Sequence, residues 1–320
     1  MLNVVASRTI QSVVPTSERF GAVLLDVTGT LLQPSEPVAE VYQRFTRPFL
    51  RPGQALFDQE EILQRFRWTY NHPERGCAGS SSSMRFVGDG RQFWSRLLTE
   101  CTGCPEAAMH EAVYRYYAGP SAWRLVPGAV QALEEMRAAG VRLAVVSNWD
   151  TRLRPLMRAL RLDHLFHALI VSAEVGCEKP NRCIFEAALT QLGGVEPGNA
   201  VHVGDDRRDD VWGARDAGLH AWLWGEEVCS FAQLSHRVLH GRRDTIWDRE
   251  DEAAAEESAA GGLATPPQLP PSSPIALSPC SLPAARMAPT LMNRQQWVGG
   301  RPFTAWAATG MRPGKQLGWA

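Results

Sequence analysis

Short apolar runs that contain β-branched residues recur along the chain, and they constrain its fold more than any other feature. These runs are Ala22–Leu25, Val141–Val146, Leu169–Val171, Ala200–Val203 and His220–Leu223. Between the later runs, apolar residues recur at helical spacing within 130–137, 153–160 and 184–192. Near-continuous apolar strands that alternate with helices are typical of a parallel sheet covered on both faces. The sequence therefore predicts an α/β fold with a doubly wound parallel sheet.

The segment from Gln33 to about Pro120 has a different pattern, with helical spacing and no strand-like run. Four helices are indicated there by the apolar faces of 38–49, 62–70, 93–98 and 109–117. Gly and Ser residues between Gly76 and Ser83 indicate a flexible loop. We predict a helical subdomain at 33–120, inserted into an α/β core formed by 20–32 and 121–230.

The two ends of the chain differ from its centre in composition and in residue pattern. Residues 1–19 contain two arginines and no acidic residue before Glu18, so we expect a disordered start or a weak transit segment. Residues 231–248 are interpreted as a C-terminal extension of the core. From 249 to 320 an acidic run precedes a Pro- and Ala-rich stretch without periodicity, which predicts a disordered tail.

Charge and cysteine content limit the classes of partner and compartment. Lys and Arg total 33 against 34 for Asp and Glu, so the formal net charge is −1 and no nucleic-acid or anionic-membrane partner is expected. No apolar run approaches the roughly 18 residues of a membrane-spanning helix. The seven irregularly spaced cysteines do not resemble a secreted disulfide framework. We therefore expect a soluble intracellular protein, cytoplasmic or nuclear, with an organelle and the oligomeric state left open.

Polar residues stand where successive strands end. Asp26 follows the first strand, Ser147 and Asn148 close the second, and Lys179 comes after the third. The carboxyl ends of parallel strands meet at one edge of the sheet, where open α/β sheets bind ligands. Taken alone, Asp26 is explained equally well as a turn cap. Lys179 is unusual because the only other lysine is Lys315, which indicates a need for a compact ammonium group rather than a guanidinium.

The fourth strand ends in an acidic cluster. Asp205, Asp206, Asp209 and Asp210 lie within six positions. Like charges at this density repel one another unless a cation lies among them, and hard oxygen ligands suit Mg²⁺. A helix N-terminus enriched in aspartate explains one or two of these residues, but not all of them.

One histidine and two pairs of cysteines are further candidates for functional residues. His202 lies within an apolar run and is interpreted as a buried core histidine. Cys101 and Cys104 have the spacing of half a metal site, but no second pair stands near them in the sequence, so packing is favoured. Cys177 and Cys183 flank Lys179, and a redox role for them is left open.

The order and spacing of these four polar motifs resemble the haloacid dehalogenase-like hydrolase superfamily over roughly residues 20–230. The resemblance implies a Rossmann-like hydrolase core, and it makes the inserted helices similar to that family's cap. The segments Asp-Val-Thr-Gly-Thr-Leu and Ser-Asn-Trp-Asp are most similar to the subgroup of haloacid dehalogenase-like hydrolase domain-containing protein 3.

The resemblance also implies roles for individual residues. Asp26 would be the nucleophile that forms an aspartyl-phosphate. Mg²⁺ would be held by Asp26, the backbone carbonyl of Thr28, Asp205 and Asp210, with Asp209 as the next candidate for the last position.

The residues at the ends of the second and third strands complete the implied site. Ser147 and Lys179 would be catalytic with Asp26, because Ser147 would donate to a phosphoryl oxygen and Lys179 would neutralise developing charge. Ser147, Asn148 and Lys179 would bind the substrate, which is expected to be a small phosphorylated metabolite.

Thr28 departs from the phosphatase pattern, which places an aspartic acid two residues after the nucleophile. A threonine hydroxyl cannot protonate the leaving group, and general acid catalysis is typically worth about 10²–10⁴-fold. We therefore expect either a slow Mg²⁺-dependent phosphatase or a catalytically impaired member that acts as a binding or interaction protein. Haloacid dehalogenation is less favoured, because it needs no metal and leaves the acidic cluster without a purpose.

Overall fold

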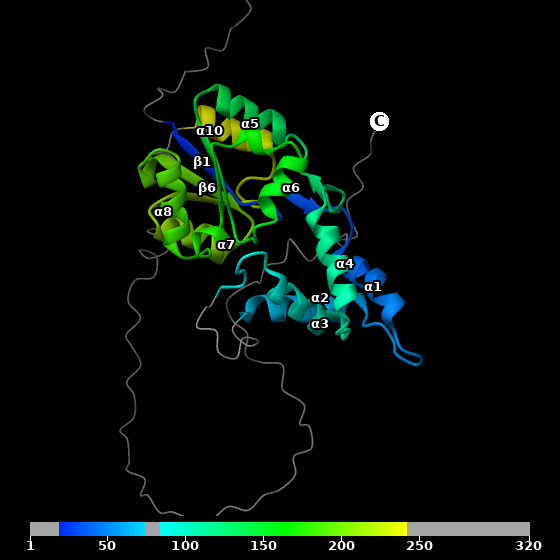
Figure 1. Cartoon of the computed structure of the whole chain (residues 1–320). Helices are drawn as coiled ribbons and strands as arrows, with labels where there is room; N and C mark the ends of the chain where they lie inside the picture. Colours follow the sequence, from blue (N-terminus) through cyan, green and yellow to red (C-terminus); the bar gives the residue numbers. More distant parts are fainter. Residues whose placement is uncertain (1–18, 74–83, 242–320) are drawn as a thin grey trace, which may run out of the picture. The chain divides into compact units, whose positions relative to one another are not determined.

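The computed structural model describes residues 19–73 and 84–241 (Figure 1). The predictions for the disordered tail at 249–320, for the Gly/Ser loop and for the start of the chain before Arg19 lie outside the described residues. So does the end of the predicted core extension after Gly241. None of the described helices is both long and apolar enough to cross a membrane.

A central parallel sheet confirms the predicted fold class. Its strands are β1 (Ala22–Leu25), β4 (Arg142–Ser147), β5 (Ala168–Val171), β6 (Ala200–Gly204) and β7 (His220–Leu223). Their order in the sheet is β5-β4-β1-β6-β7. Leu25, at the end of β1, pairs with Val145 of β4 on one side and with Val203 of β6 on the other. The carboxyl ends of these three central strands are therefore level with one another.

Helices cover both faces of the sheet (Figure 1). These helices are α5 (Ala129–Ala138), α6 (Leu153–Ala159), α7 (Ser172–Val175), α8 (Arg182–Gln191), α9 (Gly213–Asp216) and α10 (Phe231–His240). Alternate residues of a strand face opposite sides of the sheet, and Ala22 and Leu24 pack with Ile184 and Phe185 of α8. Helices α5 and α10 lie on the other side of the sheet (Figure 1). Burial on both faces explains why the strands are near-continuous apolar runs.

The insertion between β1 and β4 contains the helices that its spacing predicts. They are α1 (Val38–Thr46), α2 (Gln59–Asn71), α3 (Arg91–Thr102) and α4 (Ala107–Ala118). Their apolar faces share a separate core, which includes Tyr42, Phe66 and Leu97. The Asp58 side chain accepts a hydrogen bond from the backbone N–H of Glu61 and thereby fixes the start of α2.

A second, two-stranded sheet was not predicted. Strand β2 (Leu32–Pro34) pairs antiparallel with β3 (Trp123–Leu125) at the two points where the chain enters and leaves the insertion. The expectation of helices without strands from Gln33 onward was therefore wrong at Gln33 and Pro34. Strands this short carry no readable periodicity, and pairing with distant residues creates them.

Candidate functional site

Asp26 lies at the centre of the carboxyl edge of the sheet. It directly follows β1, and its backbone N–H donates to the carbonyl of Val203 in β6 at 2.9 Å. Its side chain is almost entirely buried. Ser147, the last residue of β4, donates from Oγ to Oδ1 of Asp26 at 3.0 Å. The edge that the sequence predicts therefore brings these two residues into contact.

Lys179 joins two of the carboxylates. Its Nζ donates to Oδ1 of Asp26 at 2.7 Å and to Oδ1 of Asp210 at 2.6 Å. Burial lowers the pKa of Lys179, but the two carboxylates outweigh that effect and raise the pKa above its usual range. Burial raises the pKa of Asp26, Lys179 opposes this rise, and Asp210 adds to it. The lysine is thus held as a cation between the two acids.

Three carboxylates form a cluster with the geometry of a cation site. One oxygen each from Asp26, Asp205 and Asp210 lies within 4.8 Å of the others. Both carboxylate oxygens of Asp205 are buried without a hydrogen-bond partner. Burial, followed by the charges of Asp26 and Asp210, raises the pKa of Asp205 well above its usual range. A buried charged group without a partner is costly, and a cation such as Mg²⁺ would remove that cost. The residues at this position therefore fit the metal.

Two glycines permit this close approach of acids. Gly29 has a φ of +88°, and a Cβ at that position would lie 2.1 Å from Oδ2 of Asp205. A Cβ at Gly204 would lie 2.1 Å from Cγ of Asp210. Neither position tolerates a larger residue without displacing a carboxylate, so the backbone around the cluster is shaped for it.

His202 belongs to the same network, which sequence reasoning missed. Its Nε2 lies 2.8 Å from Oδ1 of Asp210, and its ring contacts Phe185 edge to face. Burial lowers the pKa of His202. Burial would raise the pKa of Asp210, but Lys179 and His202 together hold it below its usual range. The interpretation as a buried histidine is correct. The polar residue inside an apolar strand was the available signal for a buried partner.

Asp209, the other candidate for the last metal position, lies outside the cluster. Its Oδ2 is 3.3 Å from Nδ2 of Asn148 and 3.5 Å from Nη2 of Arg85. Burial raises the pKa of Asp209 to about 6, although Arg85 opposes the shift. Of the two candidates, Asp210 is the one that lies beside Asp26 and Asp205.

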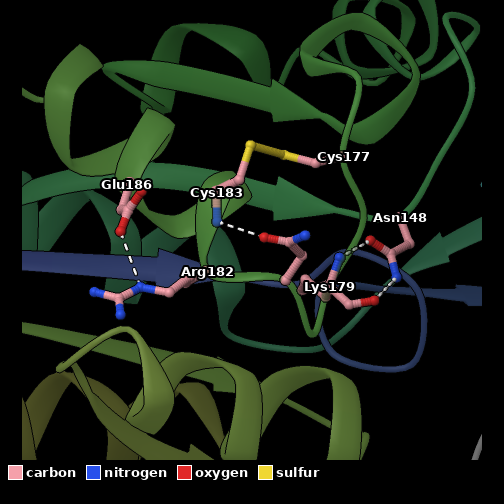
Figure 2. Close-up of a disulfide and its surroundings, with 7 residues drawn as sticks. Asn148, Cys177, Lys179, Arg182, Cys183 and Glu186 are labelled. Atoms are coloured by element: carbon pink, nitrogen blue, oxygen red, sulfur yellow. Dashed lines mark hydrogen bonds and ion pairs between the residues drawn. A yellow bond between two sulfur atoms is a disulfide. The ribbon is translucent and has the colours of Figure 1, made fainter.

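Asn148 holds the backbone of Lys179. Its Oδ1 accepts from the Lys179 N–H at 2.7 Å, and its Nδ2 donates to the Lys179 carbonyl at 3.0 Å (Figure 2). The same loop is closed by a disulfide between Cys177 and Cys183 (Figure 2). Among the other described cysteines, Cys101 and Cys104 are buried free thiols, in accord with a packing role. The backbone of Lys179 is therefore held both by Asn148 and by the disulfide-closed loop.

The insertion reaches the site through Arg85. Its Nη1 lies 3.2 Å from Oε2 of Glu178, and the backbone N–H of Phe86 donates to Oε1 of Glu178 at 3.1 Å. The Arg85 guanidinium also packs over the ring of Tyr70 at 4.6 Å from its centroid. Sequence reasoning did not find Arg85, because no pattern in the sequence orients it towards Glu178.

A hollow opens above the acids. Asp26, Thr28, Ser147, Asn148 and Lys179 line its floor together with Asp205, Asp206, Asp209 and Asp210. Its remaining lining comes largely from the insertion, β3 and the segment after β4. All of the site residues named from the sequence thus line one hollow.

Comparison with known proteins identifies the class. A family model described as haloacid dehalogenase-like hydrolase matches residues 20–218. The chain belongs to the haloacid dehalogenase-like hydrolases. It is 32% identical over 206 residues to haloacid dehalogenase-like hydrolase domain-containing protein 3 of Mus musculus. The matched region covers 62% of this chain and 79% of that protein. The bovine protein of the same name is 38% identical with the same coverage, and the subgroup predicted from the motifs is confirmed.

More distant relatives carry other names. A protein of Methanopyrus kandleri named glyceraldehyde 3-phosphate phosphatase is 27% identical, covering 62% of this chain and 81% of that protein. A crystal structure described as a dehalogenase has a TM-score of 0.53 at 20% identity and covers 71% of this chain and 99% of that one. At this identity the structural likeness supports the fold alone.

Proposed function

We propose that this hydrolase is a Mg²⁺-dependent phosphatase that acts on a small organic phosphate through an aspartyl-phosphate at Asp26. The observation that carries the proposal is the surroundings of Asp26. Its carboxylate is buried between the Lys179 ammonium at 2.7 Å and the Ser147 hydroxyl at 3.0 Å, in one cluster with the unpartnered Asp205. Relatives that are named phosphatases support the reaction class.

The reaction would proceed in two steps. An oxygen of Asp26 attacks phosphorus, a bond forms between them, and the bond from phosphorus to the leaving oxygen breaks; the leaving oxygen then takes a proton. Water next cleaves the aspartyl-phosphate, releases inorganic phosphate and regenerates Asp26. Ser147 donates to a phosphoryl oxygen, and Lys179 offsets the negative charge that gathers there.

The metal would be held by Asp26, Asp205 and the backbone carbonyl of Thr28. When bound, Mg²⁺ would neutralise the repulsion between the carboxylate and the phosphate. Asp210 completes the predicted set, although its oxygens already accept from Lys179, His202 and the backbone N–H of Asp206. A carboxylate oxygen has more than one lone pair, so these hydrogen bonds are compatible with a ligand role.

Asn148 receives a different role from the one its position in the sequence predicts. Because both ends of its amide bind the backbone of Lys179, we assign it to positioning the lysine rather than to contacting the substrate. Ser147 and Lys179 remain the proposed phosphate-binding groups.

Thr28 favours a second candidate function. Without an acid at this position, alkyl leaving groups would depart as strongly basic alkoxides, and turnover would fall by about 10²–10⁴-fold. The chain would then act as a Mg²⁺- and phosphate-binding protein that uses its helical insertion, in the position of the family's cap, to contact a partner.

Hydrolysis of p-nitrophenyl phosphate separates the two candidates. A phosphatase predicts Mg²⁺-dependent turnover that is lost in EDTA and in Asp26→Asn, and kept in Asp216→Asn, which alters an exposed aspartate of α9 outside the site. A silent wild type that gains activity in Thr28→Asp would favour the binding protein instead. Retained turnover in Asp26→Asn would refute the proposed nucleophile.

A further inference from the structure

We infer that the substrate is a phosphate ester of a phenol, whose ring lies against an aromatic wall above Asp26. The inference rests on the proposed function and names its substrate class. It is carried by four features of the described residues: the composition of the wall, the absence of an available cation on it, two unpartnered polar atoms in it, and the residue at position 28.

The wall above the acids is built from aromatic side chains. They are Tyr42, Tyr70, Phe86, Trp94, Tyr114, Tyr117, Trp123 and Trp149. Several form a connected series of rings, since the ring centroids of Tyr117 and Trp123 are 5.7 Å apart and those of Trp123 and Trp149 are 5.1 Å apart. Aromatic pairs favour edge and offset contacts at such distances, and an aryl group would extend the series. A sugar or a polyol would place several hydroxyl groups against these rings, which offer few hydrogen-bond partners.

The wall offers no available cation for a second anionic group on the substrate. Among the described residues that line the hollow, the cations are Lys179 and Arg152. Lys179 is held by Asp26 and Asp210 on the floor. Arg152 donates from Nε and Nη2 to the buried Asp150, at 2.8 and 2.7 Å, and from Nη1 to the carbonyl of Tyr114 at 2.8 Å. A leaving group that carries a carboxylate or a second phosphate would therefore be buried without a counter-charge.

The wall does offer unpartnered polar atoms. The Tyr117 hydroxyl and the Trp149 Nε1 are buried and have no hydrogen-bond partner. Two other polar groups of the wall are satisfied: Trp94 Nε1 donates to Asp150, and the Tyr114 hydroxyl donates to the carbonyl of Asp89. Buried donors are normally paired, so these two favour a ligand with a hydrogen-bond acceptor on or beside its ring.

The residue at position 28 points to the same class of leaving group. A phenol has a pKa near that of tyrosine, about 10, so a phenolate can leave phosphorus without being protonated. An alkoxide is far more basic and needs the acid that Thr28 does not supply. In the first step the Asp26 oxygen bonds to phosphorus, the bond from phosphorus to the aryl oxygen breaks, and the phenolate takes its proton from water.

Turnover of a panel of esters tests the substrate class. With Mg²⁺ present, we expect kcat/KM for 1-naphthyl phosphate to exceed that for glycerol phosphate and glyceraldehyde 3-phosphate by roughly 10²-fold or more. Thr28→Asp should raise turnover of glycerol phosphate far more than that of naphthyl phosphate. Phosphocholine belongs in the panel, because aromatic walls also bind quaternary ammonium groups. Equal rates for all esters, or a preference for phosphocholine, would overturn the inference.

Binding to Asp26→Asn separates this inference from the proposed function. By calorimetry with Mg²⁺, naphthyl phosphate should bind at least about tenfold more tightly than glycerol phosphate, since its ring is buried. If wild type turns over neither ester but this binding preference is seen, the phosphatase proposal fails and the ligand class stands. If turnover is seen without any aryl preference in rate or binding, the ligand class fails and the phosphatase stands. If neither ester is turned over or bound, both fail.

A variant in the wall tests the contact itself. We expect Tyr117→Phe to raise KM for 4-methylumbelliferyl phosphate, whose ring system carries acceptors, by about 2–10-fold with kcat unchanged, and to leave KM for naphthyl phosphate unaltered. Tyr116→Phe is the matched control, because the Tyr116 hydroxyl binds Glu36 and the residue does not line the hollow. A variant that only loses stability, with the same KM for both esters, would show that Tyr117 is packing and would overturn its assignment.

Discussion

Replacing Asp205 by asparagine should stabilise the metal-free protein and remove its response to Mg²⁺. The carboxylate of Asp205 is buried, has no hydrogen-bond partner and lies near Asp26 and Asp210. A buried unsatisfied polar group costs about 1–3 kcal/mol, and a charged one costs more. An amide of nearly the same shape removes the charge and can donate to a neighbouring carboxylate. We therefore expect Asp205→Asn to raise the free energy of unfolding in EDTA by about 2 kcal/mol.

Added Mg²⁺ should reverse this order. At a hundredfold excess over its dissociation constant, a ligand that binds only the folded state adds about 2.7 kcal/mol to the free energy of unfolding. Wild type should gain this amount, whereas Asp205→Asn should gain almost none. Urea unfolding of both proteins, with EDTA and with Mg²⁺, measures both effects, and Asp216→Asn serves as the control. A variant that is less stable than wild type in EDTA, or an equal gain from Mg²⁺ in both proteins, would refute this account of Asp205.

Two further predictions concern the backbone at the site and a histidine away from it. Gly29→Ala should abolish the stabilisation by Mg²⁺, because the added Cβ would displace Asp205. Gly53 has a similar φ but open space around it, so Gly53→Ala should lower the free energy of unfolding only by the roughly 1 kcal/mol that a left-handed alanine costs. Urea unfolding with and without Mg²⁺ measures both effects. The pKa of His167 is lowered by burial and then by Arg137, so an NMR titration should place it below 6.5, and Arg137→Gln should raise it. Below pH 6.5 the unfolded chain then binds more protons than the folded one, so the free energy of unfolding should fall as the pH drops through 6.5. A His167 pKa at or above 6.5 would contradict this prediction.

The sequence was most informative where a pattern repeats along a buried strand. The runs at Ala22–Leu25 and His220–Leu223 predicted their strands to the residue, because burial on both faces leaves few polar positions inside such strands. The location of the site at the carboxyl edge of the sheet was predicted from topology alone. Parallel strands bring their carboxyl ends together, so Asp26 and Ser147 were expected at one place, and the structure puts them in contact.

Features that depend on contacts between distant segments were not predictable in this way. The ion pair of Arg85 with Glu178 joins the insertion to the loop of Lys179, and no local sequence pattern predicts it. Strand β2 exists only because residues about ninety positions away pair with it. The aromatic wall was predicted in part as helix faces, but spacing cannot say that the Tyr117 hydroxyl is left without a partner. Such satisfaction of polar atoms is a property of the packed structure.

The most direct test of the central claim is whether phosphate becomes covalently attached to Asp26. Wild type is mixed with an aryl phosphate and Mg²⁺, quenched in acid, digested and examined by mass spectrometry. We predict a phosphorylated peptide that contains Asp26, absent in EDTA and in Asp26→Asn, and accumulating because Thr28 supplies no acid–base group for its breakdown. Metal-dependent turnover that leaves Asp26 unmodified and persists in Asp26→Asn would contradict the account.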